Sequence, residues 1–497
     1  MSAARAPAEA LWRSLRLPAE ALTRLHLTER PDPAVNSSFK LGTAAQTAIG
    51  LSGLAAAEFL RLRTGIEQDV SVNARHAVLE CKSEAYYSVE GENEEKFALF
   101  DALAGVYRTE DNSYVRIHTN FPHHKQAILD ILGCEPTRES IADAMLQWNA
   151  VEFETEAAKR KAVATALRSF LEWYTHPQGL ALANTPPVML LKVADAPKRD
   201  VTGNPVRPLD GIRVLDLTRV LAGPVCGRTL AAHGADVLWV TSPQLPSLPN
   251  LDVDTSRGKR TTQLDLNDSA DRDTFASLTE NADVFLQAYR PGSLAGKEFG
   301  VEDVVKMRPG IVYASLCAYG WDGPWKSRRG FDSLVQTATG FNVAEAEAYA
   351  AYTGDNAAPR PLPPKPFPLQ ALDHVAGYML AFGIQAALHR TITEGGSWEV
   401  RVSLAAVGQW IRSLGQLDSV AAFRDGRPLP PRSMQDSEVS RFAVKVEQAK
   451  GDRELSSAQK TMTALSHAAK LSITPVREGE APMRLNAHAA EWLPRVC

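Results

Sequence analysis

The distribution of apolar and polar residues separates a front part, a central part and a tail. In the central part, the apolar run GIRVLDL at 211–217 is followed by the helical stretch VCGRTLAAH, by Gly234 and by a second apolar run, ADVLWV at 235–240. A strand, a helix ended by glycine and a second strand form a βαβ unit, whose right-handed crossover implies a parallel sheet.

The same alternation continues along the central part. Further buried-strand candidates are TTQLDL at 261–266, ADVFLQAY at 282–289 and IVYASLCAY at 311–319, and the helical stretch FASLTENA lies between the first two. We therefore predict an α/β fold with a doubly wound, Rossmann-like parallel sheet over 209–420. Such a sheet binds ligands in a crevice at the carboxyl ends of its strands.

The front part has a different pattern. Residues 106–118 read as a hairpin, two β-rich runs around a Glu-Asp-Asn turn, and 125–133 as a short helix ended by Gly133. From 140 to 173 the spacing of apolar residues is helical. These patterns predict a smaller α+β domain.

Three proline-rich stretches, near 185–208, at 360–368 and at 427–431, mark boundaries or loops, because proline fixes its own φ and disfavours helix in the preceding residue. The predicted divisions are an N-terminal extension at 1–41, the small α+β domain at 42–196, a linker at 197–208, the Rossmann-like domain at 209–420, a second linker at 421–461 and a C-terminal closing segment at 462–497.

Two segments share one plan. Residues 49–77 and 376–407 each contain an Ala/Leu-rich helix, an Arg-Thr pair, a glycine turn, a V-x-V strand and a further helix. This similarity indicates duplicated or rearranged pieces of one parent domain.

Composition and charge narrow the class of protein. Hydrophobic residues make up 44% and charged residues 23%, as in ordinary globular proteins, and a net charge of -4 without a basic run gives no support for a nucleic-acid partner. The five cysteines are odd in number and never form C-x-x-C, which argues against a disulfide framework or a zinc site. With no apolar signal core and no membrane-length run, we expect a soluble cytoplasmic protein, a mitochondrial or peroxisomal location being the alternative.

The central part resembles the class III CoA-transferase family, also called the CaiB/BaiF family. The resemblance lies in LDGIRVLDLTRVLAGP at 209–224, HGADVLWV at 233–240, SRGKRTTQLDL at 256–266, ADVFLQAYRPG at 282–292 and the long run at 308–340. The R-x-R-T-G-x-x-Q-x-V pattern at 61–70 is similar to the family's second half. Family segments therefore occur in a rearranged order.

The resemblance places the family's nucleophile at Asp373, in LDHVAGYMLAFGIQAALHR at 372–390. Because a helix N-terminus offers free N–H groups and partial positive charge, we expect the carboxylate to be ionised. The alternative is a plain N-cap. The corresponding stretch of the front copy, Thr43 to Gln46, has no carboxylate, so we expect that copy to be catalytically silent.

The implied activity is acyl-CoA:carboxylate CoA transfer through an aspartyl mixed anhydride and an aspartyl-CoA thioester. Coenzyme A or acyl-CoA enters as substrate, and neither a metal nor a redox cofactor is required. The expected partners are an acyl-CoA and a carboxylic acid, without nucleic acid or membrane. Family members are interlocked homodimers, so the resemblance also implies a homodimer.

The resemblance further implies several coenzyme A contacts. For each basic residue among them, the alternative is solvated surface. The candidates are Val220, Leu221 and Ala222 in the loop after the first strand, the basic pair Lys259 and Arg260, and Tyr289 and Arg290 in the AYRPG loop.

Three further functions are compatible with the same residues. A 2-methylacyl-CoA racemase needs a histidine before the aspartate of a G-H-D motif, but Phe331 precedes Asp332 here, and we interpret Asp332 as structural or as a cap for the following helix. His374 is a conceivable second base, which we interpret as structural. An acyl-CoA lyase or isomerase is the second function, and a catalytically silent CoA-binding protein is the third. The sequence names neither the acyl donor nor the acceptor acid.

Overall fold

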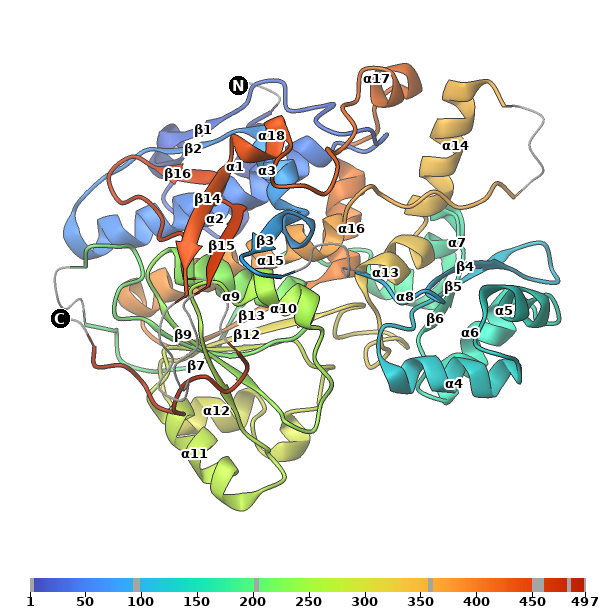
Figure 1. Ribbon diagram of the computed structural model, residues 1–497. Coiled ribbons are helices and arrows are strands. Elements are labelled where there is room, and N and C mark those ends of the chain that lie inside the picture. Colours follow the sequence, from blue (N-terminus) through green and yellow to red (C-terminus); the bar gives the residue numbers. More distant parts are fainter. Residues whose placement is uncertain are drawn as a thin grey trace.

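The computed structural model describes residues 4–92, 99–200, 205–355, 361–448, 460–480 and 484–495. Figure 1 shows a central sheet with helices on both faces, a small domain to one side, and a layer in which the front part and the tail lie together. This arrangement confirms the predicted α/β architecture with a smaller α+β domain.

The central sheet has seven strands in the order β10-β9-β8-β11-β12-β13-β7. All neighbouring pairs are parallel except β13 and β7. Its strands are β7 (Met189–Ala194), β8 (Arg213–Leu217), β9 (Asp236–Thr241), β10 (Arg260–Gln263), β11 (Val284–Gln287), β12 (Val312–Cys317) and β13 (Ser397–Ser403). The chain leaves β8 toward β9 on one side and later returns to β11 on the other, so a crevice is expected at the end of β8.

Alternating side chains of these strands enter two separate cores, as a doubly covered sheet requires. Val214 and Val312 pack with α9 (Ala222–Ala232) and α15 (Ala371–Thr393) on one face. On the other face, Leu215 and Phe285 pack with α11 (Ser269–Glu280) and α12 (Val301–Met307). The strands are apolar on both sides because both faces are buried.

The small domain is an antiparallel sheet, β4-β5-β6, covered by helices. Its elements are β4 (Gly105–Arg108), β5 (Tyr114–Ile117), β6 (Ala164–Ala166), α4 (Pro122–Leu132), α5 (Arg138–Met145) and α6 (Ala150–Lys159). The hairpin and the glycine-ended helix were predicted correctly, and Gly133 has the expected positive φ of 60°.

The helical prediction for 140–173 is wrong at 164–166, where the chain forms β6 against β5. The buried carboxylate of Glu154 accepts hydrogen bonds from the Thr165 hydroxyl and the Ala166 N–H group. This tertiary contact fixes an extended segment whose apolar spacing alone looked helical.

Two long helices, α2 (Leu41–Thr64) and α15, pack against each other and form the helical centre of the molecule. Each is apolar around most of its circumference because each is buried nearly all round. Each is followed by a strand and a helix: β2 (Val70–Val72) and α3 (Ala74–Glu80) in the front copy, and β13 and α16 (Leu404–Ser413) in the central copy. The predicted internal similarity is thus a similarity of structure. No helix among the described residues has the length and apolar character needed to cross a membrane.

The front part and the tail form shared sheets. The tail strand β15 (Thr461–Leu465) pairs with β3 (Tyr87–Val89) and with β14 (Ala443–Glu447), and β16 (Ala469–Leu471) pairs with β2. Two predicted boundaries therefore do not coincide with structural ones: β7, from the predicted small domain, is an edge strand of the central sheet, and β14 lies in the predicted second linker. The other elements are α1 (Ala6–Ser14), β1 (Leu25–Leu27), α7 (Phe170–Thr175), α8 (Pro177–Leu182), α10 (Pro249–Thr255), α13 (Asp332–Ala338), α14 (Phe341–Thr353), α17 (Ser419–Phe423) and α18 (Ser437–Ser440).

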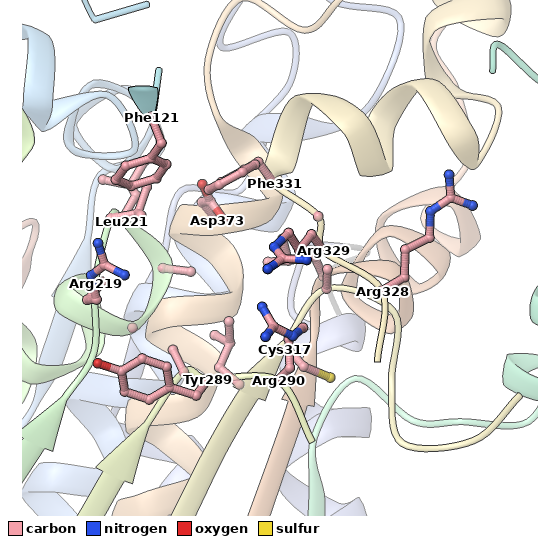
Figure 2. A pocket seen from close by; sticks show the side chains of 18 of the residues that line it. Phe121, Arg219, Leu221, Tyr289, Arg290, Cys317, Arg328, Arg329, Phe331 and Asp373 are labelled. Atoms are coloured by element: carbon pink, nitrogen blue, oxygen red, sulfur yellow. The ribbon is translucent and has the colours of Figure 1, made fainter. Parts of the chain in front are cut away.

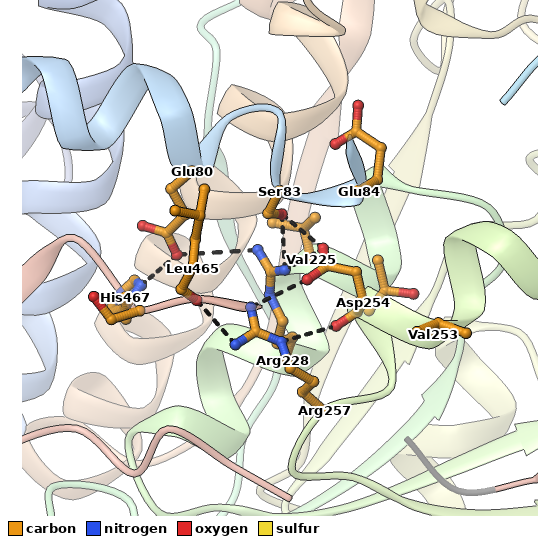
Figure 3. A network of polar contacts seen from close by, with 12 residues as sticks. Glu80, Ser83, Glu84, Val225, Arg228, Val253, Asp254, Arg257, Leu465 and His467 are labelled. Atoms are coloured by element: carbon orange, nitrogen blue, oxygen red, sulfur yellow. Dashed lines mark hydrogen bonds and ion pairs between the residues drawn. The ribbon is translucent and has the colours of Figure 1, made fainter. Parts of the chain in front are cut away.

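A buried polar network joins the three parts of the chain (Figure 3). Asp254 pairs with Arg228 and with Arg257, and it accepts a 2.6 Å hydrogen bond from the Ser83 hydroxyl of the front part. Arg257 also donates to the Leu465 carbonyl of the tail at 3.0 Å. Because each buried charge has an opposite partner, breaking one pair would leave the other uncompensated. The network therefore fixes how front part, central domain and tail fit together.

Candidate active site

Asp373 lies in the first turn of α15 and is only 8% exposed. Four residues later, Gly377 allows α15 to approach α9 very closely, because a Cβ atom there would lie 2.5 Å from the carbonyl oxygen of Ala222. This close approach places the nucleophile candidate next to the loop that joins β8 to α9.

The loop after β8 has an unusual backbone. Val220 has a φ of 74°, a left-handed conformation that β-branched residues rarely adopt and that costs about 1–3 kcal/mol. Before it, Asp216 accepts hydrogen bonds from the N–H and hydroxyl groups of Thr218, at 2.9 and 2.6 Å. The helix α9 that follows has no side-chain cap, so its first N–H groups have no partner within the helix. A strained loop and an uncapped helix thus form one wall of the site.

A cavity of about 350 Å³ opens in front of this loop. Its wall is rich in arginine: Arg219, Arg290, Arg328 and Arg329 all contribute. In Figure 2, Arg290 and Arg329 reach into the same part of the cavity, and the charge of Arg290 adds to burial in lowering the pKa of Arg329. Among the described residues neither forms an ion pair, so two like charges meet without a carboxylate between them. Such a pair suits an anionic ligand. We call this the arginine cavity.

A second cavity, of about 240 Å³, also contains Asp373 in its wall. The two cavities share Val220, Leu221, Phe331 and Asp373. We call the second one the inner cavity. Asp373 is therefore positioned where two chambers meet, one strongly cationic and one with a mixed lining.

Two neighbouring carboxylates act on Asp373. Asp332 accepts the N–H group of Asp373 at 3.0 Å, and the Gln336 amide donates to its other oxygen. Burial raises the pKa of Asp332 to about 6. Burial, and after it the charges of Asp332 and Glu84, raise the pKa of Asp373 well above its usual value. The expectation that the helix terminus keeps Asp373 ionised is contradicted, because burial and like charges act in the opposite direction.

The interpretation of Asp332 needs correction in one of its two alternatives. The sequence predicts a structural residue or a cap for the helix that follows it; the side chain does not cap that helix but caps α15. It is fully buried and belongs to the site. His374 agrees with its structural interpretation, since it is buried and its Nε2 lies 2.8 Å from the carboxylate of Glu84.

The predicted coenzyme A contacts separate into two groups. Val220, Leu221, Ala222, Tyr289 and Arg290 all line the arginine cavity. Lys259 and Arg260 line neither cavity. The Nζ atom of Lys259 is buried 2.9 Å from Asp216, beneath the loop after β8, and Arg260 pairs with Asp236 at 2.9 Å. Their expected phosphate-facing role has no support in these contacts, because both charges are already compensated.

Sequence reasoning missed three arginines of the arginine cavity. Arg219 stands inside the quoted motif, directly before Val220, and Arg328 and Arg329 precede the G-F-D motif. Adjacent arginines beside a glycine were a usable signal. They were missed because their approach to Arg290 depends on how β8, β11 and β12 lie side by side.

Comparison with known proteins gives a family match over the central domain. Residues 209–440 match the family model of CoA-transferase family III, extending beyond the predicted domain end at 420. The fold and the site thus define a CoA-transferase-type α/β domain. The domain at 209–440 is thus similar to CoA-transferase family III.

Individual relatives carry related descriptions. The chain is 27% identical over 400 residues to an acetyl-coenzyme A transferase of Hypoxylon pulicicidum, covering 70% of this chain and 65% of the relative. It is 32% identical over 247 residues to a probable fatty acyl-CoA transferase of Mycobacterium tuberculosis, covering 46% and 59%. A solved CAIB/BAIF family protein from Brucella suis is 25% identical, covers 42% of this chain and 56% of its own, and has a TM-score of 0.36. The chain matches less than two thirds of the length of these first two relatives.

Proposed function

We propose that this protein is an acyl-CoA:carboxylate CoA-transferase with Asp373 as its nucleophile. One observation carries the proposal: Asp373 is the acidic residue at the junction of the arginine cavity and the inner cavity. A transfer enzyme must bring a coenzyme A thiol and an acyl group to the same carboxylate from different directions. The arginine cavity and the inner cavity, which share the carboxylate of Asp373, satisfy this requirement.

In the proposed reaction, Asp373 is the only protein group that forms covalent bonds with the substrates. Its ionised carboxylate attacks the thioester carbonyl, the carbon–sulfur bond breaks, and coenzyme A leaves as a thiolate, giving a mixed anhydride. The thiolate then attacks the Asp373 carbonyl and releases the donor acid, leaving an aspartyl-CoA thioester. The acceptor carboxylate attacks this thioester, and the returning thiolate takes the acceptor acyl group and restores the Asp373 carboxylate.

The arginine cavity is the side from which coenzyme A would enter. The phosphates of coenzyme A are polyanionic, and Arg290 and Arg329 supply two guanidinium groups without ion-pair partners among the described residues. The loop at 220–222 lines the same cavity as these arginines and Asp373. In the proposed reaction its backbone N–H groups would donate hydrogen bonds to the oxyanion of each tetrahedral intermediate.

The raised pKa of Asp373 means that burial and the neighbouring carboxylates favour its protonated form in the empty site. The attacking form is the carboxylate, so a proton must leave before each turnover. A ligand bound beside the cationic groups of the arginine cavity changes the electrostatic field at the reacting groups from that of the empty site. Activity should therefore rise with pH through the raised pKa of Asp373.

The racemase alternative lacks its histidine, since Phe331 occupies that place in the wall of both cavities. The His118 ring stacks on Phe331 with centroids 3.9 Å apart, and burial lowers the pKa of His118 to about 3, which makes it a weak base. Incubation with a 2-methylacyl-CoA in D₂O should give no deuterium at the α-carbon. Rapid exchange would favour a racemase. The homodimer and the cytoplasmic location remain predictions, which light scattering and cell fractionation would check.

The decisive experiment traps the acyl-enzyme. The purified protein is incubated with a panel of acyl-CoAs, treated with hydroxylamine, and digested for peptide mass spectrometry. We expect an aspartyl hydroxamate at Asp373, absent in Asp373→Asn and still present in Asp332→Asn. Label on Asp332 would assign the nucleophile to the neighbouring carboxylate. No label with any donor, despite coenzyme A binding, would leave a silent binding protein.

A further inference from the structure

The inner cavity has a lining that a purely apolar acyl group would not need. Apolar side chains form much of its wall, among them Leu99, Phe100, Leu251 and Phe367. Two cationic residues, Lys82 and Arg116, line the same space together with the acidic residues Glu84 and Asp373. The volume of about 240 Å³ far exceeds the roughly 10–15 Å³ that one water needs. The cavity thus has room for a short organic group and two positive charges to meet it.

The strand β5 directs Arg116 away from the small-domain core. Its neighbours Val115 and Ile117 are buried in that core, and successive side chains of a strand point to opposite faces. Arg116 therefore lies on the other face of the small sheet, where it forms part of the inner cavity. The small domain contributes a cation to a cavity whose nucleophile belongs to the central domain.

The fully buried arginines each have an acidic partner, whereas the partly buried Arg116 has none within ion-pair distance among the described residues. Arg168 pairs with Glu154, and Arg228 and Arg257 pair with Asp254. Among the described residues, Arg116 forms no ion pair within 4.0 Å, and its Nε atom is buried without a hydrogen-bond partner. Burial lowers the pKa of Arg116, and the charge of Asp332, which is not in ion-pair contact, acts in the opposite direction. An enclosed guanidinium is costly when unpaired, so its natural complement is an anion that arrives with the ligand.

The position of Arg116 decides which part of the ligand it would meet. Because Arg116 and Asp373 form no ion pair, their charged atoms lie more than 4.0 Å apart. An acyl group joined to Asp373 has its carbonyl carbon at that carboxylate. Arg116 would therefore contact a different part of the same acyl group. Lys82 adds a second positive charge, with its Nζ atom held by the Pro368 carbonyl at 2.7 Å.

We propose that the inner cavity receives the acyl group and that Arg116, with Lys82, binds a second carboxylate carried by it. This inference rests on the proposed function and specifies its substrate class: short dicarboxylic acids and their mono-CoA thioesters. The apolar wall contacts the methylene chain, and Asp373 and Arg116 define the two ends of the substrate. Monocarboxylic acids of the same length would leave the guanidinium unpaired.

The test compares succinyl-CoA with butyryl-CoA, two four-carbon donors that differ in the second carboxylate, with acetate as acceptor. We expect wild-type kcat/KM to be at least about tenfold higher for succinyl-CoA. Arg116→Gln should lower kcat/KM for succinyl-CoA roughly 10–100-fold, the effect of losing one charge-assisted hydrogen bond. For butyryl-CoA the change should stay below about threefold, since that donor has no such bond to lose. Equal kcat/KM for the two donors, or equal losses in the variant, would overturn the proposal.

Arg108→Gln is the matched control, because Arg108 lies on the neighbouring strand β4, is exposed, and bonds only to Asn112. It should leave both donors unchanged. If Arg116→Gln does not fold, Lys82→Gln gives an independent reading. Loss of at least about threefold in the preference for succinyl-CoA supports the proposal, and an unchanged preference contradicts it.

Binding of the free acids separates this inference from the proposed function. Titration calorimetry with succinate and with butyrate, without coenzyme A, should show tighter binding of succinate that is lost in Arg116→Gln. That result together with an unlabelled Asp373 would keep the dicarboxylate site and reject the transferase. A labelled Asp373 without any preference for succinate would keep the transferase and reject the dicarboxylate site.

Discussion

The N-termini of α2 and α15 are two copies of one arrangement, and only one of them forms a site. In α2, Asp32 accepts hydrogen bonds from the N–H groups of Gly42 and Thr43, at 2.8 and 3.2 Å, and from the Thr43 hydroxyl at 2.5 Å. In α15, Asp332 accepts the N–H group of Asp373 at 3.0 Å. Both helices are thus capped by an aspartate from another segment.

The difference lies in the third helical residue and in the space around it. Thr43 donates to its capping aspartate, whereas the side chain of Asp373 is a second acid beside its cap. At the N-terminus of α2 the described chain packs closely, since a Cβ atom on Gly42 would lie 2.1 Å from the Pro31 carbonyl oxygen. Around α15 two cavities open. A capped helix N-terminus therefore becomes a catalytic candidate only when a carboxylate and free volume coincide there.

Making α15 resemble α2 should have the largest effect. Asp373→Thr removes the proposed nucleophile, so we expect transfer to fall by about 10³-fold or more. Coenzyme A binding should change little, because the arginines proposed to bind its phosphates are unchanged in this variant. Steady-state kinetics and calorimetry measure the two. A variant that keeps a tenth of the activity would show that Asp373 is not the nucleophile.

The reverse change, Thr43→Asp, should damage stability without creating a second site. It loses the hydroxyl donor and places a carboxylate against the partly buried Asp32, and we expect the free energy of unfolding to fall by about 3 kcal/mol. Thr43→Ser, which keeps the donor, is the control. Denaturant melts give the stability, and hydroxamate trapping should find no label at residue 43. Label there would mean that α2 retains an accessible site.

The close packing of α15 at Gly377 can be compared with the packing of α2 at Gly50. Gly377→Ala forces a Cβ atom against the Ala222 carbonyl, and we expect a loss of about 2 kcal/mol in stability together with lower activity, because the loop at 220–222 must move. In Gly50→Ala of α2, the added Cβ atom meets side-chain methyl groups rather than backbone, the nearest being that of Leu27 at 3.0 Å, so this change should cost less. Thermal melts and kcat/KM on both variants check the order. Equal costs would argue against a tight contact at α9.

The two capping aspartates, Asp332 and Asp32, should differ in their effect on the pH dependence of kcat/KM. Burial raises the pKa of Asp373 most, and the charge of Asp332 raises it further. Asp332→Asn keeps an acceptor for the helix but removes that charge, so the acid limb of the kcat/KM profile should move to lower pH. Asp32→Asn should not move it. An unshifted profile in Asp332→Asn would separate Asp332 from the nucleophile.

The same substitution has a signature in stability. Because burial raises the pKa of Asp332 to about 6, the folded state binds more protons than the unfolded state between its ordinary pKa of 3.8 and about 6. The stability of the wild type should therefore decline as pH rises through that window, with the full cost present above it. In Asp332→Asn this part of the decline disappears, which melts at several pH values would show.

Apolar periodicity predicted the strands β8, β9, β11 and β12 and the helices between them well, because both faces of the sheet are buried and leave continuous apolar runs. It failed at β6, where Glu154 and β5 impose an extended segment on a stretch with helical spacing. It also could not assign β7 to the central sheet, since pairing across the chain leaves no local pattern.

The sequence alone determined the α/β class, the repeated helix-strand-helix plan and the choice of Asp373, because these depend on local patterns and on motif resemblance. Only the tertiary structure decided which charges are available. It paired Lys259 with Asp216 and Arg260 with Asp236, left Arg290, Arg329 and Arg116 without acidic partners among the described residues, and placed Asp332 beside Asp373. Charge compensation depends on distances between segments far apart in the chain, and those distances exist only once the chain has folded.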